Sequence, residues 1–176
     1  HPTQGGMIVF FSVVLPSIGL SLWAPKGAAP RDQLAMRLAR FVIPAAFSMS
    51  LIAVLTYYGV RSYLHFSVAG AQLAVTHAFV YMGLLLALFA QPPSKFWTGG
   101  SELSGDRRIT WMVVVLLGLW MLVISIPIAH ELLLVNWLNP LWLQGVIALG
   151  VIVWGLVLRA IWRSRWIERL FKVTSA

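Results

Sequence analysis

The sequence has few charged residues and no cysteine. Charged side chains make up 10% of its 176 residues, whereas soluble domains contain about 25%. Without cysteine, the chain can form no disulfide, thiolate nucleophile or cysteine-ligated metal site. Only five residues are acidic, and none lies within an apolar run, so the sequence lacks the intramembrane carboxylates that mark many proton relays and cation sites. It also lacks any set of residues typical of a soluble catalytic site.

Long apolar runs dominate what the sequence does contain. Hydrophobic residues make up 60% of the chain, in runs of roughly twenty, the length needed to cross about 30 Å of hydrocarbon. The alternation typical of barrel strands is missing, so helices are the structure that satisfies the backbone in lipid. We therefore predict an all-α polytopic membrane protein, a single domain over 1–176 in contact with the lipid bilayer. Its five predicted spans are residues 6–24, 41–60, 70–90, 110–129 and 140–158.

The basic residues are distributed unevenly along the chain. Segments 25–40, 91–109 and 159–176, which lie on one side of the predicted membrane, hold all the Lys and Arg except Arg61. The positive-inside rule then places the N-terminus outside and the C-terminus in the cytoplasm. We interpret the net charge of +8 as a determinant of topology that also contacts anionic lipid. Because the arginines lie at helix ends and form no continuous groove, we expect no nucleic-acid binding.

Two polar segments carry weaker signals. Segment 91–109 contains Pro92, Pro93 and several glycines. A phosphate loop would need a strand before the glycines and a Gly-Lys-Ser/Thr motif after them, and the sequence has neither. We therefore interpret the segment as a cytoplasmic connector. The basic tail 159–176 has apolar residues interleaved after Arg163, a pattern that predicts an amphipathic helix on the membrane surface.

The first apolar run contains a proline at its centre. Pro16 has no N–H, and its ring clashes with the carbonyl of Ser12, four residues earlier, which also carries a hydroxyl. Two oxygens at mid-membrane depth then need a partner, because an unsatisfied polar group in hydrocarbon costs several kcal/mol. A neighbouring helix, a water molecule or a cation can supply it. A kink that simply packs against neighbouring helices is the structural alternative.

The third predicted span contains a histidine, His77, well inside it. Thr76 and His77 lie about a third of the way along it, and Tyr81 follows one turn later. An ionisable side chain at this depth is a functional hypothesis by default; the structural alternative is a neutral His77 that hydrogen-bonds a neighbouring helix.

Small residues recur in the third and fifth predicted spans, which predicts close helix packing. They are Gly70, Ala74, Ala78, Gly83 and Ala87 in the third, and Gly145, Ala148, Gly150 and Gly155 in the fifth. Pro44 is predicted near the start of the second span, and Pro127 is predicted to end or kink the fourth.

Several motifs together resemble a known family. Pro2 and Gln4 form a P-x-Q approach to a helix whose centre has an L-P-x-x-x-L motif, at Leu15, Pro16 and Leu20. This arrangement resembles the sixth membrane helix of cation-transporting P-type ATPases. The segments that follow also resemble helices seven to ten, including FWTGGSELSGDRR at 96–108, which is similar to a connector in a bacterial, calcium-type subgroup. No single motif is highly specific; their order and spacing carry the resemblance.

The resemblance implies that this chain is the C-terminal membrane part of a pump in a bacterial inner membrane. Its cation path would include Ser12, as the metal ligand, with Pro16, Val9, Thr76 and His77. The family's aspartate and asparagine positions are occupied here by Val13 and Val9, so the site would be incomplete. The remaining partners would be the missing N-terminal helices, the cytoplasmic ATPase domains and the transported cation.

The segment itself is expected to have no catalytic residue and no cofactor of its own. Its sequence lacks the phosphorylated Asp-Lys-Thr-Gly motif, so ATP and Mg²⁺ would be used by the parent pump. We accordingly expect the chain to be a fragment of a longer protein. Two alternatives remain open: a non-enzymatic five-span scaffold or assembly subunit, and a small independent transporter that uses His77 as a proton relay.

Overall fold

The protein is described by a computed structural model that covers residues 2–23, 34–89, 108–128, 131, 138 and 141–163. The regular elements within these ranges are all helical, which confirms the predicted all-α class. They are α1 (Pro2–Val9), η1 (Phe10–Val14), α2 (Leu15–Leu22), α3 (Leu34–Tyr58), η2 (Gly59–Tyr63), α4 (Val68–Phe89), α5 (Arg108–Val123) and α7 (Leu141–Arg163), where η denotes a π-helical turn.

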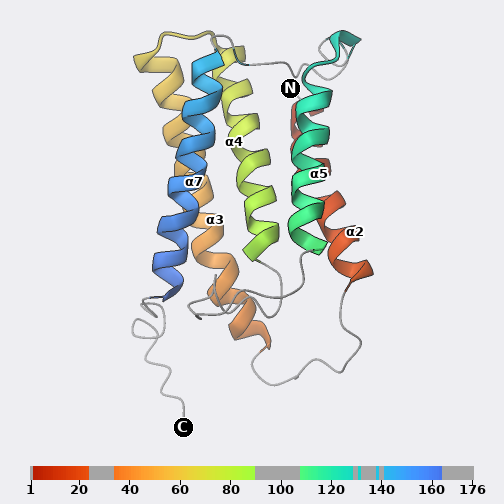
Figure 1. Cartoon of the computed structure of the whole chain (residues 1–176). Helices are drawn as coiled ribbons and strands as arrows, with labels where there is room; N and C mark the ends of the chain where they lie inside the picture. Colours follow the sequence, from red (N-terminus) through yellow and green to blue (C-terminus); the bar gives the residue numbers. More distant parts are fainter. Residues whose placement is uncertain are drawn as a thin grey trace.

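The helices form an up-and-down bundle around α4. Figure 1 shows α1–α2, α3, α4, α5 and α7 running in alternating directions, so that α1 begins and α7 ends at opposite ends of the bundle. Helix α4 contacts α1, η1, α3, α5 and α7 and is the most buried of the long apolar helices. The bundle is thus organised around the third predicted span, and the other spans pack on its faces.

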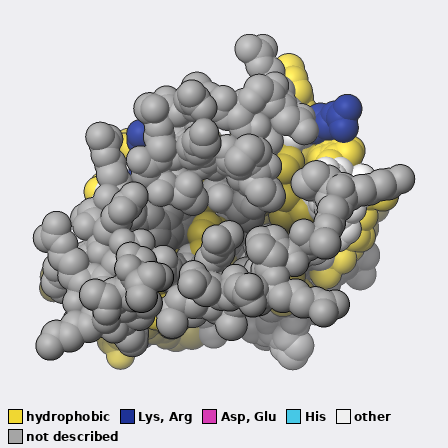
Figure 2. Space-filling view, turned by 90° about the horizontal axis from the view of Figure 1, so that it is seen from below, with side chains coloured by type: hydrophobic (Ala, Val, Ile, Leu, Met, Phe, Trp, Pro, Cys, Tyr) yellow, Lys and Arg dark blue, Asp and Glu magenta, His cyan; other side chains and the backbone are white. Residues whose placement is uncertain are grey.

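Four helical segments are long and apolar enough to cross a membrane: Gly5–Leu22, Phe41–Tyr63, Val68–Phe89 and Leu141–Ile161. Their outward faces are apolar as well. On α7, exposed Leu149, Ile152 and Leu156 alternate with buried Val151, Trp154 and Leu158. Apolar side chains also reach the rim in the view along the bundle from the end at which α7 finishes (Figure 2). A continuous apolar exterior is what a bilayer requires, so the structure supports a multi-pass membrane protein.

The fourth predicted span is shorter than expected. Residues 110–129 were predicted to cross the membrane, but α5 ends at Val123. The chain then turns, with Ser125 N–H bonded to the Leu122 carbonyl and Ile126 N–H to the Val123 carbonyl. Pro127 explains the position of the end, because it cannot donate to Val123 and its ring would clash there. The prediction that Pro127 ends this helix is confirmed, whereas the predicted length is wrong.

Pro44 lies near the start of the second candidate span, Phe41–Tyr63, as predicted, but it does not lie in the first turn of its helix. It was placed near the start of the second span, where its missing N–H would have had no partner. Helix α3 instead begins at Leu34, so Pro44 lies inside it. Pro44 is half-buried, between the exposed Val42 and Ile43 on one side and the buried Ala45 on the other. The apolar run alone gave no sign that the helix extends into the basic segment before it.

Close packing on α4 depends on its small residues, as predicted. Ala74, Ala78 and Ala87 are buried, and Gly83 lies directly against the first span. An added Cβ at Gly83 would come within 2.1 Å of the Ser12 Cβ. In α7, Gly155 packs on Leu85, whereas Gly145 has open space around it. Small residues therefore set the helix spacing at α4, while only part of the α7 series does so.

Several predicted features lie outside the described residues. These are most of the connector 91–109, most of segment 25–40, and the tail beyond Arg163. The described part of α7 extends to Arg163, five residues beyond the predicted end of the fifth span at 158.

Candidate functional site

The first span is interrupted by a π-helical turn directly before its central proline. Residues Phe10–Val14 form this turn, and the Leu15 N–H donates to the Phe10 carbonyl, five residues earlier. The regular helix α2 begins at Leu15, and Pro16 lies in its first turn, where a proline is tolerated. Because Pro16 has no N–H, neither the Phe11 carbonyl nor the Ser12 carbonyl receives a hydrogen bond from position 16. Short π-helical turns of this kind are frequent at functional sites.

Ser12 lies at the contact between this turn and α4. Its side chain is half-buried, its carbon atoms face Gly83, and its hydroxyl donates to the Ile8 carbonyl. A hydroxyl that donates one hydrogen bond retains two lone pairs that can accept a hydrogen bond or coordinate a cation. The Ser12 hydroxyl oxygen and the carbonyls of Phe11 and Ser12 are thus three neutral oxygens in one short segment.

The other predicted cation-path residues face different directions. Val9 is 51% exposed on the outside of the bundle. Thr76 is buried, donates its hydroxyl to the Gln72 carbonyl at 2.9 Å, and lines a cavity of about 410 Å³ between α1, α3 and α4. Ile8, which accepts the Ser12 hydroxyl, lines the same cavity. The structure therefore places Thr76 and Ile8 on one cavity, shows no contact between Thr76 and Ser12, and leaves Val9 exposed.

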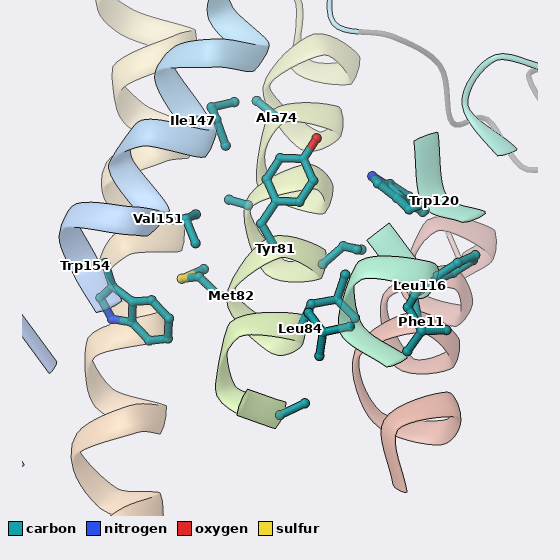
Figure 3. Packing of buried hydrophobic residues seen from close by; sticks show 14 of the residues in the cluster. Phe11, Ala74, Tyr81, Met82, Leu84, Leu116, Trp120, Ile147, Val151 and Trp154 are labelled. Carbon is teal, nitrogen blue, oxygen red and sulfur yellow. The ribbon is translucent and has the colours of Figure 1, made fainter. Parts of the chain in front are cut away.

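His77 belongs to a separate buried polar cluster. The Trp120 indole donates to His77 Nδ1 at 3.3 Å, and the Gln144 side-chain nitrogen lies 3.2 Å from the same atom. Gln144 also donates to the Tyr81 hydroxyl. Figure 3 shows the Tyr81 hydroxyl and the Trp120 indole nitrogen pointing into the same space between α4 and α5. We name this group, His77, Tyr81, Trp120 and Gln144, the polar cluster.

The polar cluster joins three helices inside the bundle. His77 and Tyr81 lie one turn apart on α4, Trp120 lies on α5 and Gln144 on α7. All four are at least nine-tenths buried. The hydrogen bonds between His77 and two neighbouring helices correspond to the structural alternative considered from the sequence. Sequence reasoning missed Trp120 and Gln144; the one available signal was an amide in the first turn of an apolar span.

The polar cluster has one unsatisfied atom. The side-chain oxygen of Gln144 is buried and has no hydrogen-bond partner. A buried polar group without a partner costs about 1–3 kcal/mol. A half-turn of the amide would place its nitrogen in the same position, again without a partner.

An aromatic contact connects the interrupted first span to the polar cluster. Phe11 lies in the π-helical turn, is 2% exposed, and its ring meets that of Trp120 edge-on at 5.1 Å between centroids. Trp120 in turn meets the His77 ring at 5.4 Å. Phe11, Leu116 and Trp120 are seen packed together in Figure 3. The first span and the α4 histidine are therefore in contact through a single indole ring.

Within the described residues, no three His, Cys, Asp or Glu side chains are grouped closely enough to hold a metal ion. A cation in this part of the bundle would have to rely on neutral oxygens. Comparison with known proteins adds no identification: no family model, curated protein or solved structure matches the chain. Function is accordingly inferred from the residues of the bundle.

Proposed function

We propose that this chain is part of the membrane domain of a cation transporter, of the P-type ATPase class, and that its first span lines the cation path. The observation that carries the proposal is the π-helical turn at Phe10–Val14 directly before Pro16. It leaves backbone carbonyls without a donor at position 16, beside a serine hydroxyl. Hard cations such as Ca²⁺ are bound by such oxygens. The remaining ligands of the ion would come from outside this chain. The residues that bind and hydrolyse ATP would also lie outside it.

The position of the turn supports this proposal. Discontinuous helices near the bilayer midplane supply carbonyl ligands for ions in many transporters, because irregular backbone is tolerated where it lines a polar site. The turn is anchored on α4 at Gly83, where the close contact fixes its backbone. The other helices present mainly apolar contacts to α4, which suits a supporting role. The sequence resemblance to a sixth pump helix points in the same direction.

The direct test is Ser12→Ala in the full-length protein that contains this chain. We expect the apparent affinity for the transported cation, measured by cation-dependent phosphorylation or uptake into vesicles, to fall about ten- to a hundredfold. A hydrogen bond or ligand contact to a charged group contributes about 1.5–3 kcal/mol, and 1.4 kcal/mol corresponds to a factor of ten.

Ser21→Ala is the matched control. Ser21 lies in the same span and donates to the Ser17 carbonyl with the same four-residue spacing, at 2.7 Å, but it is exposed. It should leave cation affinity unchanged. Equal affinity in the Ser12→Ala protein and the wild type would contradict the proposed role of the first span.

A second observation keeps a proton-coupled transporter as a candidate. His77 is fully buried in a hydrogen-bonded cluster, and buried ionisable residues in spans mark proton relays. The coding sequence upstream of His1 separates the two functions. An open frame with Asp-Lys-Thr-Gly supports the pump, whereas a start codon directly before His1 supports a small independent transporter.

A further inference from the structure

We propose that an open groove between α3, α4 and α7 binds one acyl chain of an anionic phospholipid, whose phosphate is held by Arg61. The groove is a cavity of about 420 Å³. Ala78 and Val151 form part of its floor and are almost fully buried, whereas Leu55 and Val146 on its rim are more than half exposed. The groove therefore opens on the apolar exterior of the bundle, the surface that lipid chains contact.

The groove is closed near the middle of the bundle. Its innermost lining residues are Ile52 on α3 and Val151 on α7. About one turn further in, the Trp154 indole on α7 donates to the Ser48 hydroxyl on α3 at 2.9 Å and joins the two helices; Figure 3 shows Val151 and Trp154 in succession along α7. From this closed end the groove runs toward the end of the bundle at which α3 finishes and α7 begins (Figure 1).

The length of the groove selects an acyl chain as its occupant. At a rise of 1.5 Å per residue, the lining stretch of α7 from Leu143 to Val151 is about 12 Å long. The hydrocarbon of one leaflet is about 15 Å deep, half of the bilayer core, so a chain that enters from the interface ends near the closed end. A partner helix is about 10 Å across and passes through both leaflets, which a groove that stops at mid-bundle does not accommodate. The lining suits a lipid chain, since Thr56 is the only polar side chain among the described residues that form it.

Two glycines give the groove its width. Gly59 on η2 and Gly150 on α7 line it from opposite walls, and nothing lies within 4 Å of a Cβ added to either residue. Neither glycine is therefore required by close packing of the helices. A large side chain at either position has room and would take up part of the groove.

The open end of the groove offers a site for a lipid headgroup. Leu64 and Leu143 line this end, and Trp142 beside it is 54% exposed, as is common for tryptophan at a membrane interface. Arg61, one turn before Leu64, is exposed and is the only Lys or Arg between residues 41 and 90. One of its N–H groups donates to the Phe66 carbonyl at 3.0 Å. A guanidinium has five N–H donors, and phosphate oxygens are acceptors that it binds strongly.

Photo-crosslinking in the full-length protein that contains this chain tests the inference. The probe is phosphatidylglycerol with a diazirine near the middle of one acyl chain, diluted into phosphatidylcholine bilayers. Peptide mass spectrometry should find the label concentrated on α3 and α7 around Ile52 and Val151, and not spread over the exposed face of α5. Gly150→Leu should lower this labelling about tenfold or more, because each methylene displaced from the groove weakens binding and two of them correspond to about a factor of ten.

Gly145→Leu is the matched control. Gly145 lies on the same helix and also has nothing within 4 Å of an added Cβ, but it does not line the groove, so labelling should be retained. If Gly150→Leu does not fold, Gly59→Leu fills the groove from the opposite wall and should have the same effect.

Arg61→Gln tests the headgroup contact. It should reduce labelling by the phosphatidylglycerol probe about fivefold and leave labelling by an uncharged diacylglycerol probe with the same chain unchanged. Equal labelling of the Gly150→Leu and Gly145→Leu proteins, label spread evenly over all lipid-facing helices, or a protein segment crosslinked in the groove in place of lipid would overturn the inference. None of these outcomes depends on whether the first span carries a cation.

Discussion

Replacement of Gly83 by alanine should separate the first span from α4. A Cβ built at Gly83 meets the Ser12 Cβ at 2.1 Å and the Ser12 Cα at 3.1 Å. Ordinary carbon contacts begin near 3.4 Å, so the helices must move apart by roughly 1 Å. Ser12 cannot yield by rotation, because its Cβ is fixed to the backbone. Overpacking of this kind costs about 1–3 kcal/mol. We therefore expect Gly83→Ala to lower the midpoint of thermal unfolding in lipid or detergent.

A matched control distinguishes this clash from the general effect of alanine in a helix. Gly118 lies on the exposed face of α5 with nothing within 4 Å of its added Cβ. Gly118→Ala should stabilise the protein by about 0.5–1 kcal/mol, because glycine weakens helix interiors. Ser12→Gly combined with Gly83→Ala should recover most of the lost stability, since it removes the atom that clashes. If Gly83→Ala is as stable as Gly118→Ala, the contact between η1 and α4 is not as close as described.

Two further substitutions test the packing of α7. Ser48→Ala should destabilise the protein by about 0.6–2 kcal/mol, because it removes the hydroxyl that accepts a hydrogen bond from the buried Trp154 indole at 2.9 Å. Ser50→Ala is the control and should have almost no effect, because the Ser50 hydroxyl is exposed and bonds within its own helix. Equal unfolding midpoints for the two variants would argue against the contact between Ser48 and Trp154. Gly155→Ala should lower the unfolding midpoint less than Gly83→Ala does, because its new Cβ meets the flexible end of the Leu85 side chain, at 2.5 Å. Gly145→Ala should leave the midpoint unchanged or raise it, because there is open space around Gly145.

The sequence predicted the helical class and the positions of most spans because the length of an apolar run is a direct physical signal. It predicted less well where a local signal was overridden. Pro44 suggested a helix start, yet α3 extends ten residues further toward the N-terminus. Around Pro16 the sequence indicated an interruption but not its form. Whether the helix accommodates Pro16 by a kink or by a π-helical turn depends on how it packs on Gly83, which lies sixty-seven residues after Pro16 in the chain.

The polar cluster was beyond prediction for a different reason. His77 was singled out because an ionisable residue stands out in an apolar span. Its partners are uncharged or amphipathic, and each alone has an ordinary explanation: tryptophan as a large side chain packed inside a span, glutamine near a helix start. Trp120 and Gln144 gain significance only when three helices place them around one nitrogen. The apolar runs of α5 and α7 do not show that Trp120 and Gln144 turn toward the same atom of α4.

The arrangement of α4 relates the two sites to each other. Thr76 and His77 are adjacent in sequence and therefore about 100° apart around the helix. One faces the cavity beside the first span, and the other faces α5 and α7. Phe11 connects the two regions, because it belongs to the π-helical turn and contacts the Trp120 indole, which donates to His77. A change in the π-helical turn that moves Phe11 must also move Trp120 or open a cavity beside it, since buried rings are packed without spare volume. The contact predicts that Phe11→Ala, which leaves every polar atom in place, alters the Trp120 indole NMR signal as well as stability. An unchanged signal would show that the two sites are independent.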